Sequence, residues 1–378
     1  MSDKDKDYAL TGGEALAEIP APEFAYQPQF PDGDKLGIGL IGCGGITEQH
    51  LTAYKKAGLN VRVLCNRTLE KAESKRDEFF PEAEITSDPD EVLKRDDIAV
   101  VDITYHPDLR AEWIEKALQA GKHVLSQKPF VLDLKVGEKL VATAAENDRL
   151  LAVNQNGRWA PYVRYSQLAI DAGLIGKVQS VNINVSWDHQ WVKGTPFETI
   201  HHLLLYDFAI HWIDMTCCFM GRPAKAAHAM LTRSAGQKVV PPLLASAQLA
   251  FEGGVASLHF DGSTPTEASE TIEIVGTKGR IRCSGKPCEA HDLQLITEDG
   301  IARPTLEGQW MPDGFGGTMG ELLCAIEEGR EPHNSAAHNL GSLQAAFALI
   351  QSADSGRKVT VGDARKVGKN CQPSGFAR

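Results

Sequence analysis

The stretch Gly39-Leu40-Ile41-Gly42-Cys43-Gly44-Gly45-Ile46-Thr47 decides the fold of the N-terminal half of the chain. It ends a short apolar run and opens a segment of helical spacing, which predicts a strand, a glycine turn and a helix. Such a turn directs backbone N–H groups and the positive end of the helix at one point, a geometry that suits a dinucleotide pyrophosphate. We expect Gly42 to make the tight turn and Gly44 to let the backbone approach a phosphate. Thr47 stands at the third glycine position, so an ordinary strand–helix turn remains the alternative.

The composition excludes several classes of protein. The 378 residues are enough for two domains, and a net charge of −11 argues against nucleic acid or an anionic membrane as a partner. No apolar run approaches the roughly 20 residues that span a bilayer, and the charged start Met1–Asp7 lacks the apolar centre of a signal peptide. The eight cysteines have no framework spacing, so we expect reduced thiols and a cytoplasmic protein.

From residue 36 to residue 154 short apolar runs alternate with helical patterns. The run Ile98–Ile103 is typical of a strand buried on both faces of a sheet. Pro107 begins a helical segment that Gly121 ends. This rhythm predicts an α/β Rossmann domain with a right-handed, doubly wound parallel sheet over residues 36–154.

The pattern changes over residues 155–378. Val181–Asp188 alternates apolar and polar residues, as in a strand with one polar face. Gly253-Gly254 and Gly276-Thr277-Lys278-Gly279 each separate two short strand patterns and predict hairpins. Helical spacing returns at 321–328 and 339–353. We predict a second α+β domain, built on an open, mainly antiparallel sheet.

Residues 1–35 are expected to form an N-terminal arm. Four prolines in this segment alternate with aromatic residues, and prolines disfavour a packed element. One interpretation is a flexible tail. The other is an arm that covers its own or a neighbouring subunit.

Ser126-Gln127-Lys128-Pro129 follows the predicted strand His123–Leu125. Ligands of doubly wound sheets bind at the carboxyl ends of the strands. A lysine there can donate to a substrate hydroxyl or to the nicotinamide ribose, and it can stabilise the alkoxide that forms as hydride leaves. The structural alternative for Lys128 is a solvated lysine before a turn proline.

Asp207-Phe208-Ala209-Ile210-His211 places a polar pair on one face of an otherwise apolar helix. A histidine near a carboxylate is suited to act as a general base near neutral pH. We therefore take Asp207 and His211 as catalytic candidates, with Asp207 either holding His211 or gripping a substrate hydroxyl. The alternative is a core histidine with Asp207 near the helix cap.

These motifs occur in one order along the chain. Gly42-x-Gly44, Gly121-Lys122-His123-Val124-Leu125-x-x-Lys128-Pro129 and Asp207-x-x-x-His211 are followed by Val275–Ile281 and Ser352–Arg357. The order resembles the glucose–fructose oxidoreductase / inositol dehydrogenase / rhizopine-catabolism (Gfo/Idh/MocA) family over about residues 36–360. The resemblance implies a Rossmann domain that binds NAD or NADP, a second domain whose sheet often mediates oligomers, and redox chemistry at a sugar-like hydroxyl or carbonyl. It also implies that Lys128 is the central lysine, His211 the acid/base and Asp207 a substrate contact.

Three residues depart from the family pattern. Gln127 replaces a glutamate, which removes a carboxylate neighbour from the lysine, and Arg110 replaces a histidine after the fourth strand. Asn66 stands where an acidic residue usually holds the adenosine ribose diol and repels a 2′-phosphate. Because Arg67 and Lys71 follow closely, they could hold that phosphate through charge-assisted bonds. We therefore expect NADP rather than NAD, although an asparagine can still bind a diol.

The residues expected at the cofactor lie in the glycine turn and at the ends of the neighbouring strands. They are Gly42, Gly44, Gly45, Ile46, Asn66, Arg67, Lys71, Thr104, His106, Gln127 and Lys128.

The residues expected at a polyhydroxylated substrate include junction and strand-end side chains. They are Lys128, Asn156, Arg158, Trp187, Asp207 and His211. A hydrogen-bonded hinge around Asn156 and Arg158, and an interface role for Trp187, are the alternatives. His201, His202, Asp207, His211 and Asp214 have ligand chemistry, but the family resemblance offers a metal-free explanation, so no metal is expected.

The sequence therefore predicts an NAD(P)-dependent oxidoreductase of a sugar, cyclitol or glycoside-like substrate, working as a homo-oligomer, a dimer or tetramer. One alternative is a redox-assisted glycosidase that retains its cofactor. The other is a non-catalytic sensor of a dinucleotide or sugar, against which the presence of both Lys128 and His211 argues.

Overall fold

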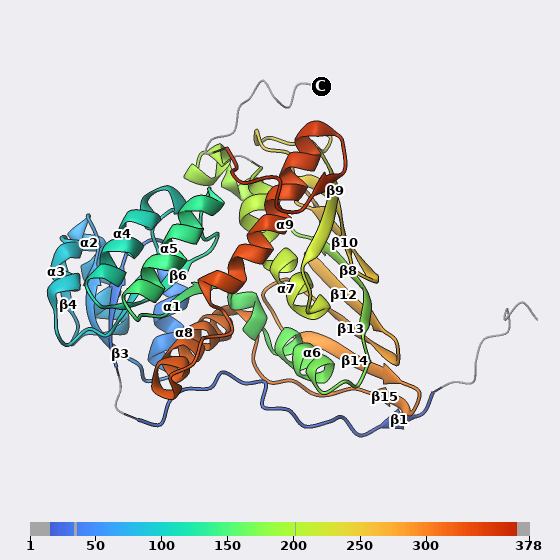
Figure 1. Cartoon of the computed structure of the whole chain (residues 1–378), viewed down its shortest axis with the longest axis horizontal. Coiled ribbons are helices and arrows are strands. Elements are labelled where there is room, and N and C mark those ends of the chain that lie inside the picture. The colour runs from blue at the N-terminus through green and yellow to red at the C-terminus, as the bar shows by residue number, and fades with distance from the viewer. Residues whose placement is uncertain (1–15, 34–35, 201, 369–378) are drawn as a thin grey trace, which may run out of the picture.

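The computed structural model describes residues 16–33, 36–200 and 202–368, and its N-terminal part contains a six-stranded parallel sheet (Figure 1). The strand order is β4-β3-β2-β5-β6-β7, and every neighbouring pair is parallel. The strands are β2 (Gly37–Ile41), β3 (Asn60–Cys65), β4 (Glu84–Thr86), β5 (Val100–Ile103), β6 (His123–Gln127) and β7 (Leu151–Asn154). The prediction of a Rossmann-like parallel sheet is confirmed.

Helices connect these strands as the alternating pattern predicts. They are α1 (Thr47–Lys56), α2 (Leu69–Phe79), α3 (Pro89–Lys94), α4 (Pro107–Gln119) and α5 (Leu134–Glu146). The short elements β4 and α3 were not predicted, because three and six residues are too few to show a period.

The second sheet has ten strands in the order β1-β15-β14-β13-β12-β8-β11-β10-β9-β16. Its pairs are antiparallel except β1 with β15 and β8 with β11. The strands are β1 (Glu18–Ile19), β8 (Val178–Ser186), β9 (Ala224–Thr232), β10 (Leu244–Phe251), β11 (Gly254–Asp261), β12 (Ser269–Gly276), β13 (Gly279–Gly285), β14 (His291–Thr297), β15 (Gly300–Ala302) and β16 (Val359–Thr360). Both predicted hairpins and the mainly antiparallel sheet are confirmed.

Helices cover one face of this sheet. In Figure 1, α6 (Pro161–Asp171), α7 (Ile210–Met220) and α9 (Ala336–Ser355) lie on the side toward the Rossmann part. The opposite face carries no helix among the residues that the structure describes. None of the described helices has the length and apolar character that a membrane crossing requires.

Helix α8 (Trp310–Glu328) joins the two parts by packing against α1. It begins before the predicted 321–328, since its glycine-rich start does not show helical spacing. The glycines are needed for close approach: a Cβ on Gly317 would lie 2.2 Å from the Trp159 side chain, and one on Gly320 would lie 2.2 Å from the carbonyl oxygen of Gln29.

The described part of the arm, residues 16–33, packs along its own chain. Strand β1 pairs with β15, the Phe24 and Tyr165 rings meet edge to face at 5.1 Å, and the Tyr165 hydroxyl donates to the carbonyl of Pro22 at 2.8 Å. The side chain of Gln27 donates to the carbonyl of Glu307 at 2.9 Å. Residues 1–15 and 34–35 of the predicted arm lie outside the described residues.

A carboxyl group is buried between α6 and the second sheet. Glu270 is 1% exposed and accepts from the Tyr162 hydroxyl at 3.1 Å, and Tyr162 stacks on His291 at 3.7 Å. Burial raises the pKa of Glu270 to about 7 and lowers the pKa of His291 to about 4. Both groups are therefore neutral in mildly acidic solution.

This cluster makes the stability of the protein depend on pH. The carboxyl of Glu270 holds its proton more tightly when folded, so its contribution is complete below its ordinary pKa of 4.5 and is lost as pH rises through about 7. We expect the unfolding free energy to lose up to about 3 kcal/mol from this group between pH 5 and 8. Urea unfolding at both pH values should show that this loss is missing in Glu270→Gln. Glu273→Gln, on the same strand but paired with Arg282 on the solvent face, is the control and should keep the parental pH dependence.

Candidate active site

The glycine turn after β2 leaves an open space at the start of α1. Gly42 has a φ of +109°, and a Cβ there would lie 2.5 Å from the Thr104 hydroxyl oxygen, so this position requires glycine. The buried Thr47 hydroxyl donates to the Gly42 carbonyl at 2.9 Å, which explains a threonine at the third glycine position. Gly44 and Gly45 are exposed, and a Cβ on either would meet nothing within 4 Å. This turn fits a pyrophosphate.

The end of β3 meets the glycine turn through Asn66. Its side-chain oxygen accepts from the Cys43 N–H at 3.0 Å, and its amide donates to the carbonyl of Thr68 at 2.8 Å. Arg67 follows Asn66 directly in the chain, and Lys71 lies in the first turn of α2; both side chains are exposed. Asn66 thus orders the turn, while the two neighbouring cations face solvent.

Lys128 extends from the carboxyl end of β6, as predicted, and meets Asp207. Its ammonium lies 3.0 Å from the Asp207 carbonyl oxygen and 3.3 Å from the carboxylate Oδ2. The side chains are 14% and 7% exposed. Gln127 brings no carboxylate to the lysine, and Asp207 is the carboxylate that contacts it. Asp207 contacts Lys128; the sequence had offered His211 or a substrate hydroxyl as its partner.

The helical pair is split between two kinds of helix. Asp207 belongs to η5 (Leu204–Phe208), a π-helix, and His211 lies in the first turn of α7. Single π turns are frequent at functional sites. Nδ1 of His211 is buried without a hydrogen-bond partner among the described residues, and the ring lies edge-on to Trp310 at 5.2 Å. Burial, together with the charge of Lys128, lowers the pKa of His211 well below 6.5, so the imidazole is neutral.

Arg110 holds the loop that carries Lys128. The guanidinium is 1% exposed and donates to the carbonyl of Tyr105 at 2.7 and 2.9 Å and to the carbonyls of Gln127 and Pro129. Burial lowers the pKa of Arg110 to about 10, so it stays cationic near neutral pH. The sequence identified Arg110 as a departure from the family pattern but did not reveal this supporting role.

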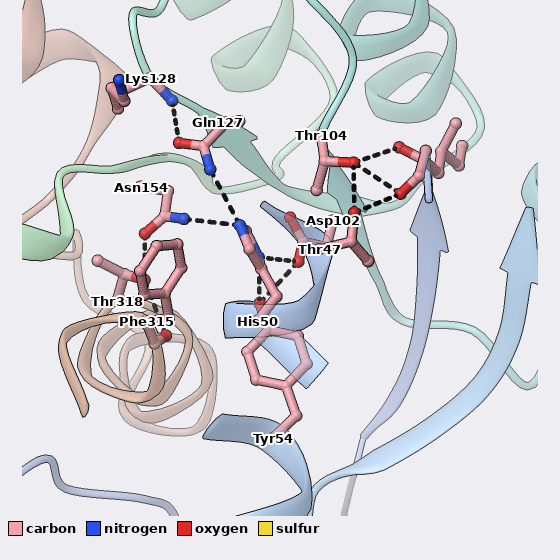
Figure 2. A network of polar contacts seen from close by, with 12 residues as sticks. Thr47, His50, Tyr54, Asp102, Thr104, Gln127, Lys128, Asn154, Phe315 and Thr318 are labelled. Carbon is pink, nitrogen blue, oxygen red and sulfur yellow. Dashed lines mark hydrogen bonds and ion pairs between the residues drawn. The ribbon is translucent and has the colours of Figure 1, made fainter. Parts of the chain in front are cut away.

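A buried polar network lies beneath Lys128 (Figure 2). His50 contacts the Asp102 carboxylate at 2.7 Å and the side-chain amides of Gln127 and Asn154 at 3.0 and 3.1 Å. His50 and Asp102 were not among the predicted site residues, because helical and strand spacing places them in a core. The available signal was a carboxylate, Asp102, inside a strand that is otherwise apolar.

Two family profiles match the chain. Residues 36–155 match the oxidoreductase family with an NAD-binding Rossmann fold, and residues 163–282 match the GFO/IDH/MocA C-terminal domain. The chain belongs to the Gfo/Idh/MocA family of oxidoreductases. It is an NAD(P)-dependent dehydrogenase or reductase.

Named relatives span most of this Gfo/Idh/MocA chain. D-apiose dehydrogenase of Paraburkholderia graminis is 25% identical, over 85% of this chain and 88% of that protein. Inositol 2-dehydrogenase of Rhizobium meliloti is 24% identical, over 86% and 98%. An oxidoreductase from Agrobacterium radiobacter, solved in complex with NAD+, L-tartaric acid and magnesium, shares the fold with a TM-score of 0.77 at 21% identity, over 87% of this chain and 99% of that one.

In this Gfo/Idh/MocA chain, two residues expected at the substrate are bonded inside the protein. Arg158 is 9% exposed and pairs with both carboxylate oxygens of Asp214, at 2.6 and 2.7 Å. Asn156 is 1% exposed and accepts from the Trp310 indole N–H at 2.7 Å. Because these groups support the junction from within, we remove both from the substrate set. Trp187 remains, half-buried at the end of β8 and edge-on to His189 at 4.8 Å.

The side chains that resembled a metal site belong to separate networks. His202 pairs with Asp354 at 2.6 Å, Asp214 pairs with Arg158, and Asp207 pairs with Lys128. His201 lies outside the described residues. Within residues 16–33, 36–200 and 202–368, no three His, Cys, Asp or Glu side chains are arranged to hold a metal ion.

Proposed function

We propose that the protein transfers hydride between a nicotinamide dinucleotide and a hydroxyl or carbonyl carbon of a sugar, cyclitol or glycoside-like substrate. The observation that carries this proposal is the Lys128 ammonium, held by Asp207 at the carboxyl edge of the sheet. Its charge helps to lower the pKa of the buried His211, whose Nδ1 has no hydrogen-bond partner among the described residues. Relatives named for D-apiose and inositol support a polyhydroxylated substrate. Relatives named as dehydrogenases favour neither the glycosidase nor the sensor.

The residues present fit a dinucleotide. The open turn Gly42–Ile46 would hold the pyrophosphate. Asn66, Arg67 and Lys71 would hold the adenosine ribose, and Thr104, His106 and Lys128 would contact the dinucleotide along the strand ends. The side-chain amide of Gln155, after β7, is buried with both polar atoms unpartnered in the described residues, as expected beside a polar ligand. Gln127 is 4% exposed and its amide is bonded inside the protein, so we assign it a supporting role. When bound, the dinucleotide accepts or supplies the hydride.

The protein side chains handle the proton and the oxygen. In the oxidative direction the neutral imidazole of His211 accepts the hydroxyl proton as the carbon gives up hydride. The Lys128 ammonium donates a hydrogen bond to the oxygen and stabilises its developing negative charge. Asp207 holds the Lys128 ammonium in position for this hydrogen bond. The reverse direction uses the same groups with the proton returned from His211.

Turnover can be tested directly. The absorbance of the reduced cofactor is followed while a panel of sugars, inositols and glycosides is screened with NAD and with NADP. We expect net cofactor reduction with at least one polyhydroxylated substrate. Cofactor retained through purification without net reduction, together with glycoside cleavage, would contradict the proposal and favour the glycosidase.

We propose NADP as the preferred cofactor, because Asn66 brings no negative charge and the side chains of Arg67 and Lys71, which follow it in the chain, are exposed. A charge-assisted hydrogen bond contributes about 1.5–3 kcal/mol, so Arg67→Ala should weaken NADP binding by about 10- to 100-fold and leave NAD binding nearly unchanged. Titrations of both dinucleotides measure this. Lys94→Ala, an exposed cation at the far end of α3, is the control for net charge. A parental preference for NAD would refute the assignment.

We also propose a cytoplasmic homo-oligomer. The sheet face without a helix supports self-association, and the described cysteines, all of them free thiols, support a reducing compartment.

A further inference from the structure

A chain of buried side chains connects α1 to the backbone of Lys128 (Figure 2). Asp102 and His50 are 0% exposed, with Nδ1 of the histidine 2.7 Å from Oδ2 of the carboxylate. The Tyr54 hydroxyl donates to the same oxygen at 2.7 Å. Gln127 lies between His50 and Lys128, with contacts of 3.0 Å to His50 Nε2 and 2.6 Å to the Lys128 backbone nitrogen.

One backbone group sets the direction of these hydrogen bonds. The Lys128 N–H can only donate, so the atom of Gln127 that it meets must be the side-chain oxygen. Gln127 therefore presents its NH2 group to Nε2 of His50. A ring nitrogen that receives an N–H must carry a lone pair, so Nε2 is unprotonated. The single ring proton is then on Nδ1, where it is donated to Asp102.

The Asn154 amide, in the orientation found in the structure, agrees with this assignment. Its oxygen accepts from the Thr318 hydroxyl at 2.8 Å, and its NH2 group faces Nε2 of His50 at 3.1 Å. Two amide donors thus converge on Nε2, and an imidazolium would place N–H against N–H. Burial and the charge of Asp102 raise the pKa of Tyr54 well above 10, so the phenol keeps the proton that it donates.

We propose that Gln127 is a positioning residue for Lys128, and that it acts through a His50 ring held neutral, as the Nδ1–H tautomer, by Asp102. The proposal rests on the proposed function, because it assumes that Lys128 acts on the reacting oxygen. The Gln127 oxygen fixes the backbone from which the lysine side chain starts. Arg110 holds the carbonyls of the same loop, so the loop is fixed at both its donors and its acceptors.

An amide is required at position 127 for this arrangement. A glutamate would still accept from the Lys128 N–H. Its second carboxylate oxygen would, however, replace the NH2 group that donates to Nε2 and would place an acceptor there. Nε2 of His50 would then face an acceptor, so both ring nitrogens would have to present an N–H. The glutamine presents a donor to Nε2 and adds no second carboxylate beside the ring.

Nitrogen-15 NMR of histidine-labelled protein at pH 7 tests the tautomer without turnover, with the His50 signals assigned through their loss in His50→Gln. We expect a protonated Nδ1 and an unprotonated Nε2 in the parent, and protons on both nitrogens in Gln127→Glu. Gln237→Glu is the matched control: the Gln237 amide also accepts from a backbone N–H and donates within a buried site, far along the chain. It should leave the His50 signals unchanged. A protonated Nε2 in the parent would overturn the proposal.

Kinetics test the positioning role. Gln127→Ala should lower kcat by about 10- to 100-fold with dinucleotide affinity nearly unchanged, as expected for displacement of a reacting group by about 1 Å. Gln127→Glu keeps the acceptor for the Lys128 N–H and should restore most of that loss. An unchanged kcat in Gln127→Ala would contradict the positioning role of Gln127. If Lys128→Ala instead keeps turnover, the proposed function is wrong, and the NMR result still decides the tautomer.

Discussion

Lys128→Ala is expected to lower kcat by about 10²- to 10³-fold and to leave dinucleotide affinity largely intact. The loss of one preorganised donor to a developing oxyanion commonly has this effect. Lys128 is placed for that role because it follows the carboxyl end of β6 and its ammonium is held at 3.0 and 3.3 Å by Asp207. Single-turnover rates, together with cofactor titration, separate the chemical step from binding.

Lys122→Met provides the control from the other end of the same strand. Its ammonium also donates to backbone carbonyls, those of Arg95 and Ile98 at 2.7 and 2.9 Å, but at the amino edge of the sheet. We expect this variant to lose stability and to keep the parental rate. Near-parental turnover in Lys128→Ala would show that the assigned role is wrong.

His211→Asn is expected to lower the rate by about 10²- to 10⁴-fold, the range for the loss of a general acid/base. The pH dependence is the sharper observation. Oxidation needs the neutral imidazole, and burial together with the charge of Lys128 lowers the pKa of His211 well below 6.5. The acidic limb of the pH–rate profile that is due to His211 should therefore lie below pH 6.5. This limb should be missing from the pH–rate profile of His211→Asn.

An ordinary buried histidine would behave differently. His123→Asn removes a half-buried ring at the amino end of β6, where Nδ1 accepts from the Leu150 N–H at 3.0 Å. This control should lower the melting temperature and leave the pH–rate profile unchanged. If His211→Asn behaves in the same way, His211 is structural and Lys128 is left as the proton-handling candidate.

The sequence predicted five strands of the parallel sheet and the strands β8, β10, β11, β12 and β13 of the second sheet, because burial repeats along a strand with a local period. It predicted the glycine turn, the place of Lys128 at the end of β6 and the two hairpins for the same reason. It missed the start of α8, where glycines are required by close packing against Trp159 and Gln29. It also missed the longer elements β9, β14 and α6, and the short elements β1, β4, β15, β16 and α3.

Some features of the candidate site could also be predicted from the sequence, and others could not. Lys128, Asp207 and His211 could be named from local motifs, and the open turn at Gly44 could be predicted from its glycines. The partners of these polar groups could not be predicted, because they lie far away in the sequence. Arg158 pairs with Asp214, Asn156 accepts from Trp310, and Asp207 contacts Lys128 across 79 residues.

By itself, the sequence determined the two kinds of sheet, the nucleotide turn and the positions of the lysine and histidine, since these depend on backbone preference and the periodic burial of apolar side chains. Only the tertiary structure decided the partners: the carboxylate that holds Lys128, the amide that fixes its backbone, and the His50 ring that Gln127 and Asn154 approach from two different strands. Hydrogen bonds depend on atomic distance and direction, and those are set when segments as far apart as His50 and Asn154 are brought together by the fold.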